Sequence, residues 1–444
     1  MTNKNVVAQN KDKDKDKFSA TTATSIVIAN MIGTGVFTSL GFQLLDIQSA
    51  PVILFLWGLG GLLALCGALC YAELGAALPR SGGEYNYLAR VYHPGVGFIA
   101  GWVSATVGFA APTALAAMTA GAYFHAVFAE ASQTWVAVGL VVLTTVVHLR
   151  SRRQSARFQM LFTGLKVVLI VVFIVAAWIM VEEVQPVRWM PVLADLDLVT
   201  SGSVAVALIY VNYAYTGWNA ATYLAGEMQE PSRNLPRVLL LGTLFVAFLY
   251  VMLHLLFLSV APMSAMAGQI EIGYIVADYA FGEVGRQLIA STLGILLVST
   301  ISAMLLAGPR ALQAIGQDYR SLRVLRAENK HGIPQAAIMT QASITLVMVL
   351  TATFESVLLF ASFVLALNTL FTVVGVWRLR KREPALSRPF KVPLYPLPVV
   401  VFMTITLWTL VYVAFQEPIE VGFALGLIGL GWLFYLLSRA RVAD

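Results

Sequence analysis

Long runs of apolar residues constrain this chain more than any other feature of its sequence. A helix that crosses a lipid bilayer needs about 20 mostly apolar residues, and charge clusters divide the sequence into twelve such runs. The predicted spans are 19–42, 51–78, 95–125, 133–149, 158–181, 201–225, 236–260, 284–307, 334–352, 356–378, 396–415 and 418–438. We therefore expect an all-α integral membrane protein with 12 transmembrane helices.

The composition agrees with a membrane protein and excludes several other classes. Hydrophobic residues make up 59% of the 444 residues and charged residues 12%, about half the charged share of a soluble domain. A soluble enzyme, a disordered protein and a nucleic-acid partner are thereby excluded. The two cysteines, Cys66 and Cys70, lie on one helix face and cannot connect distant elements. His125 and His254 are isolated, so we expect no metal site, and we expect no cofactor.

The basic residues predict the orientation of the chain. With twelve alternating spans, 26 of the 29 Lys and Arg residues fall on the side of the two termini. Only Arg188 and Arg286 fall on the opposite side, and Lys166 lies inside a span. Positive charge marks the cytoplasmic side, so we expect a multi-pass protein of the cytoplasmic (inner) membrane with both termini cytoplasmic. Residues 1–17 are polar and predict a disordered cytoplasmic tail.

Two of the spans are interrupted at mid-membrane. The first contains Gly33-Thr34-Gly35, and the sixth has polar residues around Gly217. An unwound segment survives at bilayer depth only where it lines a cavity or is packed in protein. A pair of such helices in corresponding halves points to a transporter site, although glycines also allow close helix packing.

A spacing of five helices between the two interruptions suits two inverted repeats. The predicted repeats are 18–181 and 201–381, with helices 11 and 12 appended at 396–438.

The ends of half-helices suggest what such a site binds. The half-helix that begins after Gly35 presents free N–H groups and a positive dipole end, which suit a carboxylate. The half-helices that end near Met31 and Tyr213 present free carbonyl groups, which suit an ammonium group. Together these elements predict a site for a zwitterion, and hence for an α-amino acid.

Four segments resemble the amino acid–polyamine–organocation (APC) superfamily over nearly the whole chain. They are IGTGVF (32–37), YAELGAALPRSGGEYNYL (71–88), AYTGWNAATYLAGEMQEPSRNLPR (214–237) and RPFKVPLYP (388–396). The sixth helix is most similar to L-type amino acid transporters and their bacterial relatives. The resemblance implies a LeuT-type 5+5 inverted repeat with helices 1 and 6 unwound, alternating access and amino acid substrates.

The resemblance also assigns roles by position. The segment 33–35 matches the one that holds the substrate carboxylate, the carbonyls of Met31 and Tyr213 match acceptors for the amino group, and the Tyr213 ring closes the site. Thr216 stands where many L-type members have glycine, which implies a shorter pocket and small substrates. Asn219 could bond either the substrate or helix ten. The candidate substrate-binding residues are Met31, Gly33, Thr34, Gly35, Tyr213, Ala214, Thr216 and Asn219.

Lys166 lies roughly 13 Å into the fifth span, at 1.5 Å per residue beyond Arg157. A charge at this depth is costly and is therefore a candidate for function. The resemblance implies that its ammonium bonds the unwound first helix and replaces sodium. Coupling or gating is one interpretation, in which burial makes proton transfer chemically reasonable, and a fixed structural cation is the other. The coupling or gating candidates are Lys166, Tyr213, Ser299 and Thr300.

We therefore predict a sodium-independent secondary transporter of small neutral α-amino acids, and not an enzyme. It would work by amino acid exchange or by proton coupling, in which case protons are a partner beside the substrate and the bilayer. The alternatives are an amine or cationic amino acid antiporter, which needs a carboxylate in the pocket, and a non-transporting amino acid sensor, which needs a signalling domain. Residues 126–134 contain no cysteine, so we expect no disulfide-linked heavy chain. Glu73 is expected to pair with a loop arginine.

Overall fold

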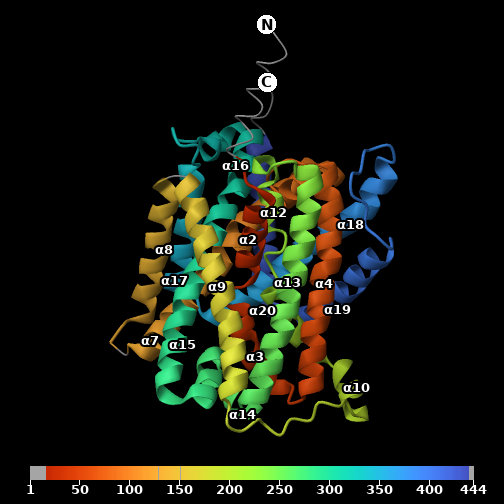
Figure 1. Cartoon of the computed structure of the whole chain (residues 1–444). Coiled ribbons are helices and arrows are strands. Elements are labelled where there is room, and N and C mark those ends of the chain that lie inside the picture. The colour runs from red at the N-terminus through yellow and green to blue at the C-terminus, as the bar shows by residue number, and fades with distance from the viewer. Residues whose placement is uncertain (1–16, 129, 151, 440–444) are drawn as a thin grey trace.

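The computed structural model describes residues 17–128, 130–150 and 152–439, and these residues form a helical bundle with one isolated β-bridge, Phe18 to Met228 (Figure 1). Apart from Lys17, the predicted tail lies outside the described residues. Within the described part, ten helices are long and apolar enough to cross a membrane, or eleven if the bent pair α10 (Leu193–Val199) and α11 (Gly202–Ala214) is one span. The chain is thus an all-helical, multi-pass membrane protein.

Every predicted span overlaps a helix of the structure. The helices are α2 (Ala20–Met31) and α3 (Gly35–Asp46), α4 (Ala50–Ala77), α6 (Pro94–Val103) with η1 (Ser104–Phe109) and α7 (Ala110–Val127), α8 (Gln133–Arg150), α9 (Arg152–Met180), α11 and α12 (Ala220–Tyr223), α13 (Pro231–Val260), α15 (Ile272–Ala307), α17 (Gln335–Thr351), α18 (Phe354–Arg382), α19 (Leu397–Gln416) and α20 (Pro418–Arg439). Of these, α17 is the short apolar helix that falls below the length of a span.

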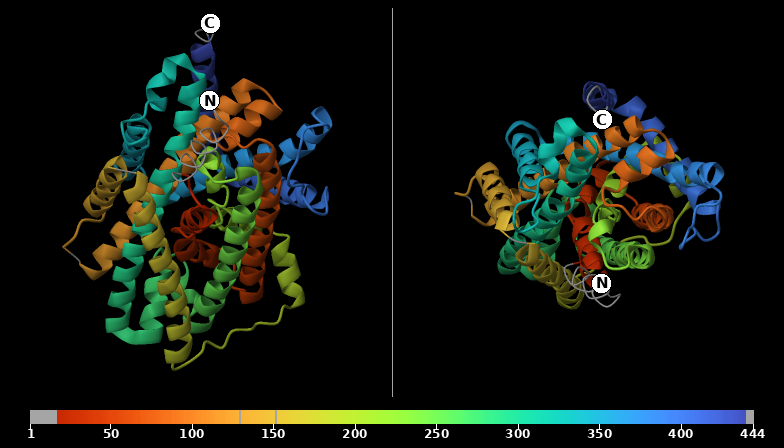
Figure 2. Two further views of the ribbon diagram at one scale, coloured as in Figure 1. Left: turned by 45° about the horizontal axis from the view of Figure 1, so that its top comes forward. Right: turned by 90° about the horizontal axis from the view of Figure 1, so that it is seen from above.

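The first span lies at the centre of the bundle. Seen along the bundle axis, α2 and α3 are surrounded by the other helices (Figure 2). In their most apolar stretch 83% of the residues are buried, against 28% in α8 and in α9. A helix that is apolar all round belongs in a protein core or in lipid, and the burial assigns the first span to the core and α8 and α9 to the rim.

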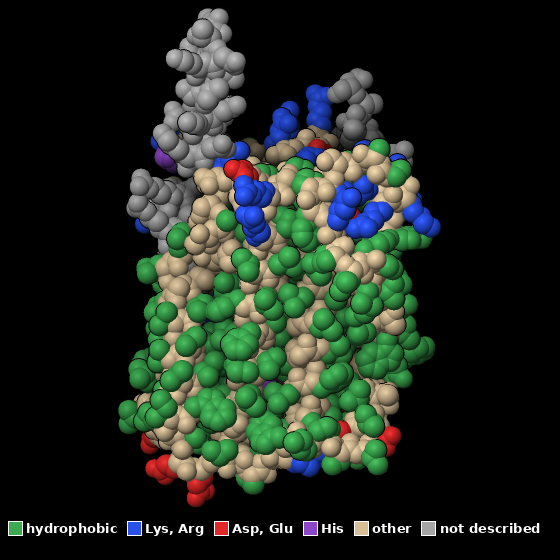
Figure 3. All heavy atoms as spheres, turned by 45° about the vertical axis from the view of Figure 1, so that its right-hand side comes forward, with side chains coloured by type: hydrophobic (Ala, Val, Ile, Leu, Met, Phe, Trp, Pro, Cys, Tyr) green, Lys and Arg blue, Asp and Glu red, His purple; other side chains and the backbone are tan. Residues whose placement is uncertain are grey.

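Charged side chains separate toward the two ends of the bundle. On the face shown in Figure 3, Lys and Arg gather at one end and Asp and Glu at the other, with a broad apolar band between them. This band has the appearance expected of a surface that faces lipid. The separation agrees with the charge pattern read from the sequence.

Two helical features add to the sequence prediction. The element α15 covers Ile272–Ala307, but the backbone at Gly282 is not helical (φ 68°, ψ −165°), so two helices meet there at a kink. The second of them begins after Gly282 and agrees with the eighth span, which is predicted from 284. The third span contains a π-helical turn, η1, and such turns are frequent at functional sites.

Glu73 joins α4 to α18 and to the loop that follows it. Its carboxylate accepts a hydrogen bond from Arg380 Nε at 2.8 Å, and Arg388 Nε lies 3.5 Å from the same carboxylate oxygen. The backbone N–H of Val392 donates to the same carboxylate at 2.7 Å. The expected pair with a loop arginine is confirmed, but the closer partner comes from the last turn of α18.

Candidate functional site

The two helix breaks cross in contact with each other. Residues 32–34 separate α2 from α3, and residues 215–219 separate α11 from α12. A Cβ atom on Gly35 would lie 2.5 Å from the Cα of Ala214, and one on Gly217 would lie 2.6 Å from the carbonyl carbon of Asn30. Gly217 also has a φ of 101°, which side chains rarely allow. Glycine is therefore required at both positions for the two helices to approach this closely.

A small cavity lies where the breaks meet, and it has a volume of about 10 Å³. Seven of the eight predicted substrate-binding residues line it, and the exception is Asn219. Its lining is Asn30, Met31, Gly33, Thr34, Gly35, Pro112, Tyr213, Ala214, Thr216, Thr300 and Met304. The volume is that of about one water molecule, so a larger ligand can enter only after the breaks move apart.

The first break presents amide groups to this cavity. Thr34 precedes α3, and its side chain makes no hydrogen bond that caps the helix. The N–H groups at the start of a helix have no partner within it and carry the positive end of the dipole. Gly33, Thr34 and Gly35 line the cavity, so an anionic group placed there would meet these amides.

Lys166 contacts the carbonyl end of the first break. Its Nζ atom lies 2.6 Å from the carbonyl oxygen of Ile32 and 2.7 Å from the Thr300 hydroxyl, and the side chain is 1% exposed. The Thr300 hydroxyl also donates to the Ile32 carbonyl at 2.9 Å. The structure thus joins α9, α15 and the break of the first span at one oxygen atom.

The other predicted gating residue of α15 does not join this group. Ser299 is buried, and its hydroxyl finds no hydrogen-bond partner among the described residues. The hydroxyl of Ser302 lies 2.9 Å from Nε2 of His148 on α8. Of the α15 hydroxyls considered from the sequence, the Thr300 hydroxyl is the one that bonds Lys166.

Tyr250 on α13 was not anticipated from the sequence. Its hydroxyl lies 2.6 Å from the carbonyl oxygen of Met31 and 3.1 Å from that of Ala214. One buried hydroxyl therefore bridges the two helix breaks. It also occupies the Met31 carbonyl that the resemblance assigned to the substrate amino group. A lone tyrosine in an apolar helix carries no sequence signal for such a bridge.

Asn30 was also missed, and it supplies an acceptor to the cavity. Its side-chain N–H donates to the carbonyl of Ile26 at 2.7 Å. Its Oδ1 atom is buried and has no hydrogen-bond partner among the described residues. A buried amide oxygen without a donor is costly, and an ammonium group in the cavity would supply one.

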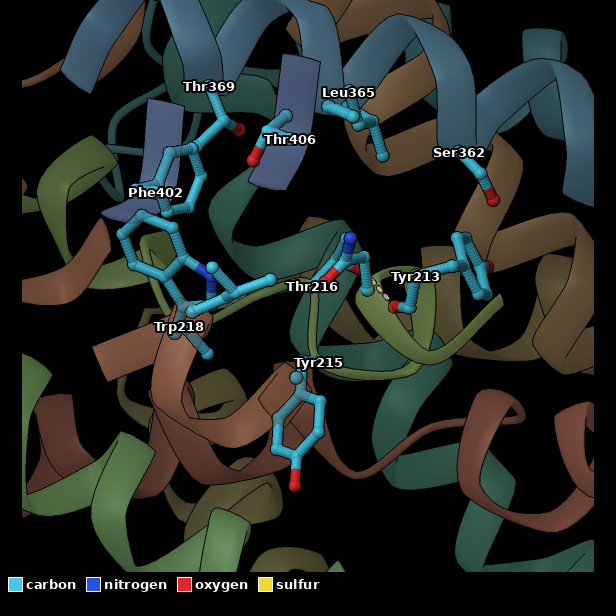
Figure 4. Close-up of a pocket in the computed structure, with 14 residues that line it drawn as sticks. Tyr213, Tyr215, Thr216, Trp218, Ser362, Leu365, Thr369, Phe402 and Thr406 are labelled. Atoms are coloured by element: carbon cyan, nitrogen blue, oxygen red, sulfur yellow. Dashed lines mark hydrogen bonds between the residues drawn. The ribbon is translucent and has the colours of Figure 1, made fainter. Parts of the chain in front are cut away.

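Thr216 stands between three cavities. Besides the cavity at the breaks, it lines one of about 50 Å³ toward α4, α18 and α19, and one of about 40 Å³ toward η1 and α18. Its hydroxyl donates to the carbonyl of Tyr213 at 2.7 Å, beside the ring of Trp218 (Figure 4). Thr216 therefore borders all three spaces, and its hydroxyl also covers the second predicted ammonium acceptor.

Asn219 faces a carboxylate rather than helix ten. Its side-chain N–H donates to Glu84 at 2.9 Å, and both residues line the cavity of about 40 Å³. Glu84 begins the short helix α5 (Glu84–Val91) and is buried, and its burial raises the pKa of its carboxyl above the ordinary value. Glu84 lies outside the predicted spans and enters the bundle from a connecting segment, so the apolar cores of the spans give no sign of a carboxylate in the pocket.

The chain is similar to known proteins over nearly its whole length. The sequence model of a family described as "Amino acid permease" matches residues 18–433. The chain is 29% identical to the Asc-type amino acid transporter 1 of Mus musculus, over 94% of this chain and 80% of that protein. It is 27% identical to the large neutral amino acids transporter small subunit 2 of Mus musculus, over 94% of this chain and 80% of that protein. It is 25% identical to the b(0,+)-type amino acid transporter 1 of Mus musculus, over 93% of this chain and 85% of that protein.

Proposed function

Since the chain belongs to the amino acid permease family and is a membrane transporter of amino acids, we propose that it moves small neutral α-amino acids across the cytoplasmic membrane by alternating access. The substrate carboxylate would bind the amides of residues 33–35, and its amino group would bind the acceptors opposite. These acceptors are Asn30 Oδ1 and, once the Tyr250 and Thr216 hydroxyls are displaced, the carbonyls of Met31 and Tyr213.

The observation that carries the proposal for small substrates is the position of Thr216. Thr216 is the residue that lines all three cavities, so it stands beside the path of a substrate side chain from the cavity at the breaks to either neighbouring cavity. Both neighbours are small, and a close-packed interior resists added volume. Alanine or serine would fit in front of Thr216, and leucine or phenylalanine would need the space behind it.

The contacts of Lys166 support sodium independence. Its ammonium lies 2.6 Å from the Ile32 carbonyl, so a positive charge already stands at the carbonyl end of the first break. A bound sodium ion nearby would be repelled. The driving force would then be exchange of one amino acid for another or the entry of protons.

The proposed topology follows the charge pattern and the two breaks. It has twelve spans in a LeuT-type fold, with inverted repeats at 18–181 and 201–381, helices 11 and 12 at 396–438, and both termini in the cytoplasm. The separation of basic and acidic residues toward opposite ends supports this orientation (Figure 3).

We also propose that no heavy chain is attached through a disulfide bond. The relative from Mus musculus whose name includes "small subunit" is, by that name, part of a larger assembly. In this chain both cysteines, Cys66 and Cys70, are reduced and buried inside α4. Neither thiol is placed to reach a second protein, so any such partner would have to bind without a covalent bond.

The test is uptake of labelled alanine, serine, threonine and leucine into proteoliposomes of the purified protein. Uptake only into vesicles preloaded with amino acid identifies an exchanger, and uptake into empty vesicles driven by an inward proton gradient identifies a symporter. Arginine and agmatine are included because Glu84 borders a neighbouring cavity. Preference for these cations would replace the proposal by the cationic alternative. Binding without any uptake would favour a sensor.

A further inference from the structure

The sequence Ser-Gly-Gly-Glu at 81–84 brings a carboxyl group into the centre of the bundle. Gly82 and Gly83 have φ values of 110° and 51°, in a region that side chains rarely adopt. A Cβ atom on Gly83 would lie 2.9 Å from the Thr222 hydroxyl and 2.9 Å from the ring of Tyr223. The two glycines thus let the loop pack directly on α12, and they place the next side chain, Glu84, against it.

Glu84 is 2% exposed and is surrounded by uncharged hydrogen-bond donors from four helical elements. Two donors come from the sixth span, the Asn219 amide at 2.9 Å and the Tyr223 hydroxyl at 2.7 Å. The others are the Asn368 amide of α18 at 2.6 Å, the Ser104 hydroxyl of η1 at 3.2 Å and the Tyr71 hydroxyl of α4.

These five donors differ in what they connect. Tyr71, Ser104 and Asn368 belong to long or continuous helices, whereas Asn219 is the N-cap of the four-residue helix α12 and Tyr223 is its last residue. Both ends of α12 are therefore held by the same carboxyl group. If α12 moves away while Glu84 stays with its donors on α4, η1 and α18, both hydrogen bonds break.

We propose that Glu84 acts as a clamp that holds α12 against α4, η1 and α18 and thereby keeps the substrate pathway closed at the cytoplasmic end. The inference rests on the proposed transport function and adds a positioning residue to it. Glu84 lines the cavity of about 40 Å³, and Thr216 lines both this cavity and the one at the breaks. Release of α12 would open the cavity beside Glu84 and, past Thr216, the way to the proposed substrate site.

The physical basis is the cost of leaving a buried carboxyl group without its donors. A carboxylate has about four lone-pair positions for hydrogen bonds, and hydrogen bonds to a charged group are stronger than neutral ones. Loss of both α12 donors leaves Glu84 under-satisfied until water replaces them. The closed arrangement is therefore favoured until the cavity beside Glu84 is hydrated.

The first test compares two matched tyrosines that donate to the same carboxyl group. Tyr223→Phe removes a donor on α12, and Tyr71→Phe removes one on α4. KM is measured from each side, in right-side-out and inside-out membrane vesicles. Tyr223→Phe and Glu84→Gln should raise the external KM and lower the internal KM, changing their ratio about tenfold through a shift toward the state open to the cytoplasm. Tyr71→Phe should leave this ratio unchanged.

A control carboxyl group is available at the same end of the molecule. Glu73 is also buried, but its partners among the described residues are Arg380, Arg388 and the N–H of Val392, and none of these belongs to α12. Glu73→Gln should change the amount of folded protein without changing the ratio of the two KM values. Equal ratios in Tyr223→Phe, Glu84→Gln and the native protein would overturn the clamp. If Glu84→Gln does not fold, the tyrosine pair alone decides.

A second readout needs no substrate. In a background with Cys66→Ala and Cys70→Ala, Thr369→Cys places a reporter thiol on the cavities beside Trp218. A membrane-impermeant maleimide is applied to inside-out vesicles. Glu84→Gln and Tyr223→Phe should label about tenfold faster than the reporter protein with native residues at these positions, and Tyr71→Phe should not. Faster labelling in a protein that transports no amino acid would support the clamp and refute the transport proposal, whereas unchanged labelling with intact transport would refute the clamp alone.

Discussion

Replacing Thr216 with glycine should extend the substrate range toward large side chains. Thr216→Gly removes three heavy atoms from the place where cavities of about 50, 40 and 10 Å³ meet. One methylene group in an apolar pocket changes discrimination by about 10- to 200-fold. The ratio of kcat/KM for leucine to that for alanine should therefore rise at least about tenfold. A flexible glycine also costs roughly 0.5–1 kcal/mol of stability, but this cost cancels in a ratio measured on one protein.

Two further substitutions separate the volume of Thr216 from its hydroxyl group. Thr216→Ser keeps the hydrogen bond to the Tyr213 carbonyl and removes the methyl group, so we expect a smaller gain for leucine. Thr216→Val fills the same space and frees that carbonyl, so KM should change for all substrates without a gain for leucine. The assay is competition of unlabelled leucine, phenylalanine and tryptophan against labelled alanine. Alanine uptake with an unchanged leucine-to-alanine ratio in the Gly and Ser variants would refute the assignment of the pocket.

Three other predictions follow from buried and bridging groups. Lys166→Met removes a charge that costs at least about 2.5 kcal/mol at the bilayer centre, so the Tm of the protein in detergent should not fall. The transport turnover rate should drop about tenfold, because the hydrogen bond to the Ile32 carbonyl is lost. An unchanged turnover rate would show that Lys166 takes no part in the transport cycle. Asn30→Leu deletes the unpartnered acceptor of the cavity and should raise KM about tenfold, and an unaltered KM would contradict its role in binding. The Arg188 guanidinium and nearby donors hold the pKa of Asp195 below its ordinary value. The native protein should therefore have a higher Tm than Asp195→Asn above about pH 4, and this difference in Tm should disappear as the pH falls further. A difference in Tm that persists in acid would show that the charge of Asp195 does not stabilise the protein.

The spans and the two breaks were accessible from the sequence because each depends on local composition. Apolar length predicts a membrane helix from the residues of that helix alone, and every predicted span overlaps a helix of the structure. The two breaks could be predicted because Gly33-Thr34-Gly35 and Gly217 stand in corresponding positions of the first and sixth spans. The predicted start of the eighth span at 284 likewise lies beside Gly282, where the backbone is not helical and the second part of α15 begins.

The contacts that cross between helices could not be predicted in the same way. Tyr250 lies far in sequence from the Met31 carbonyl, and Glu84 from its donors on α12 and α18, and a single sequence shows no pairing of positions. Glu84 looked like a loop carboxylate because the residues before it are polar and contain two glycines. Those glycines were the available signal, since their positive φ values allow the loop to enter the bundle.

The two broken helices are held by groups of opposite hydrogen-bonding role, and the role follows from what each one exposes. The helix α2 ends at Met31 and leaves carbonyl groups without helical partners, so the groups that satisfy the Ile32 carbonyl are donors, Lys166 and Thr300. The helix α12 is attached through side-chain donors, so the group that receives them is an acceptor, the carboxyl group of Glu84. The two attachments share no residue and come from different parts of the chain, α9 and α5. A transport cycle that releases both half-helices can therefore break them in either order, and a state with only one half-helix released is structurally allowed.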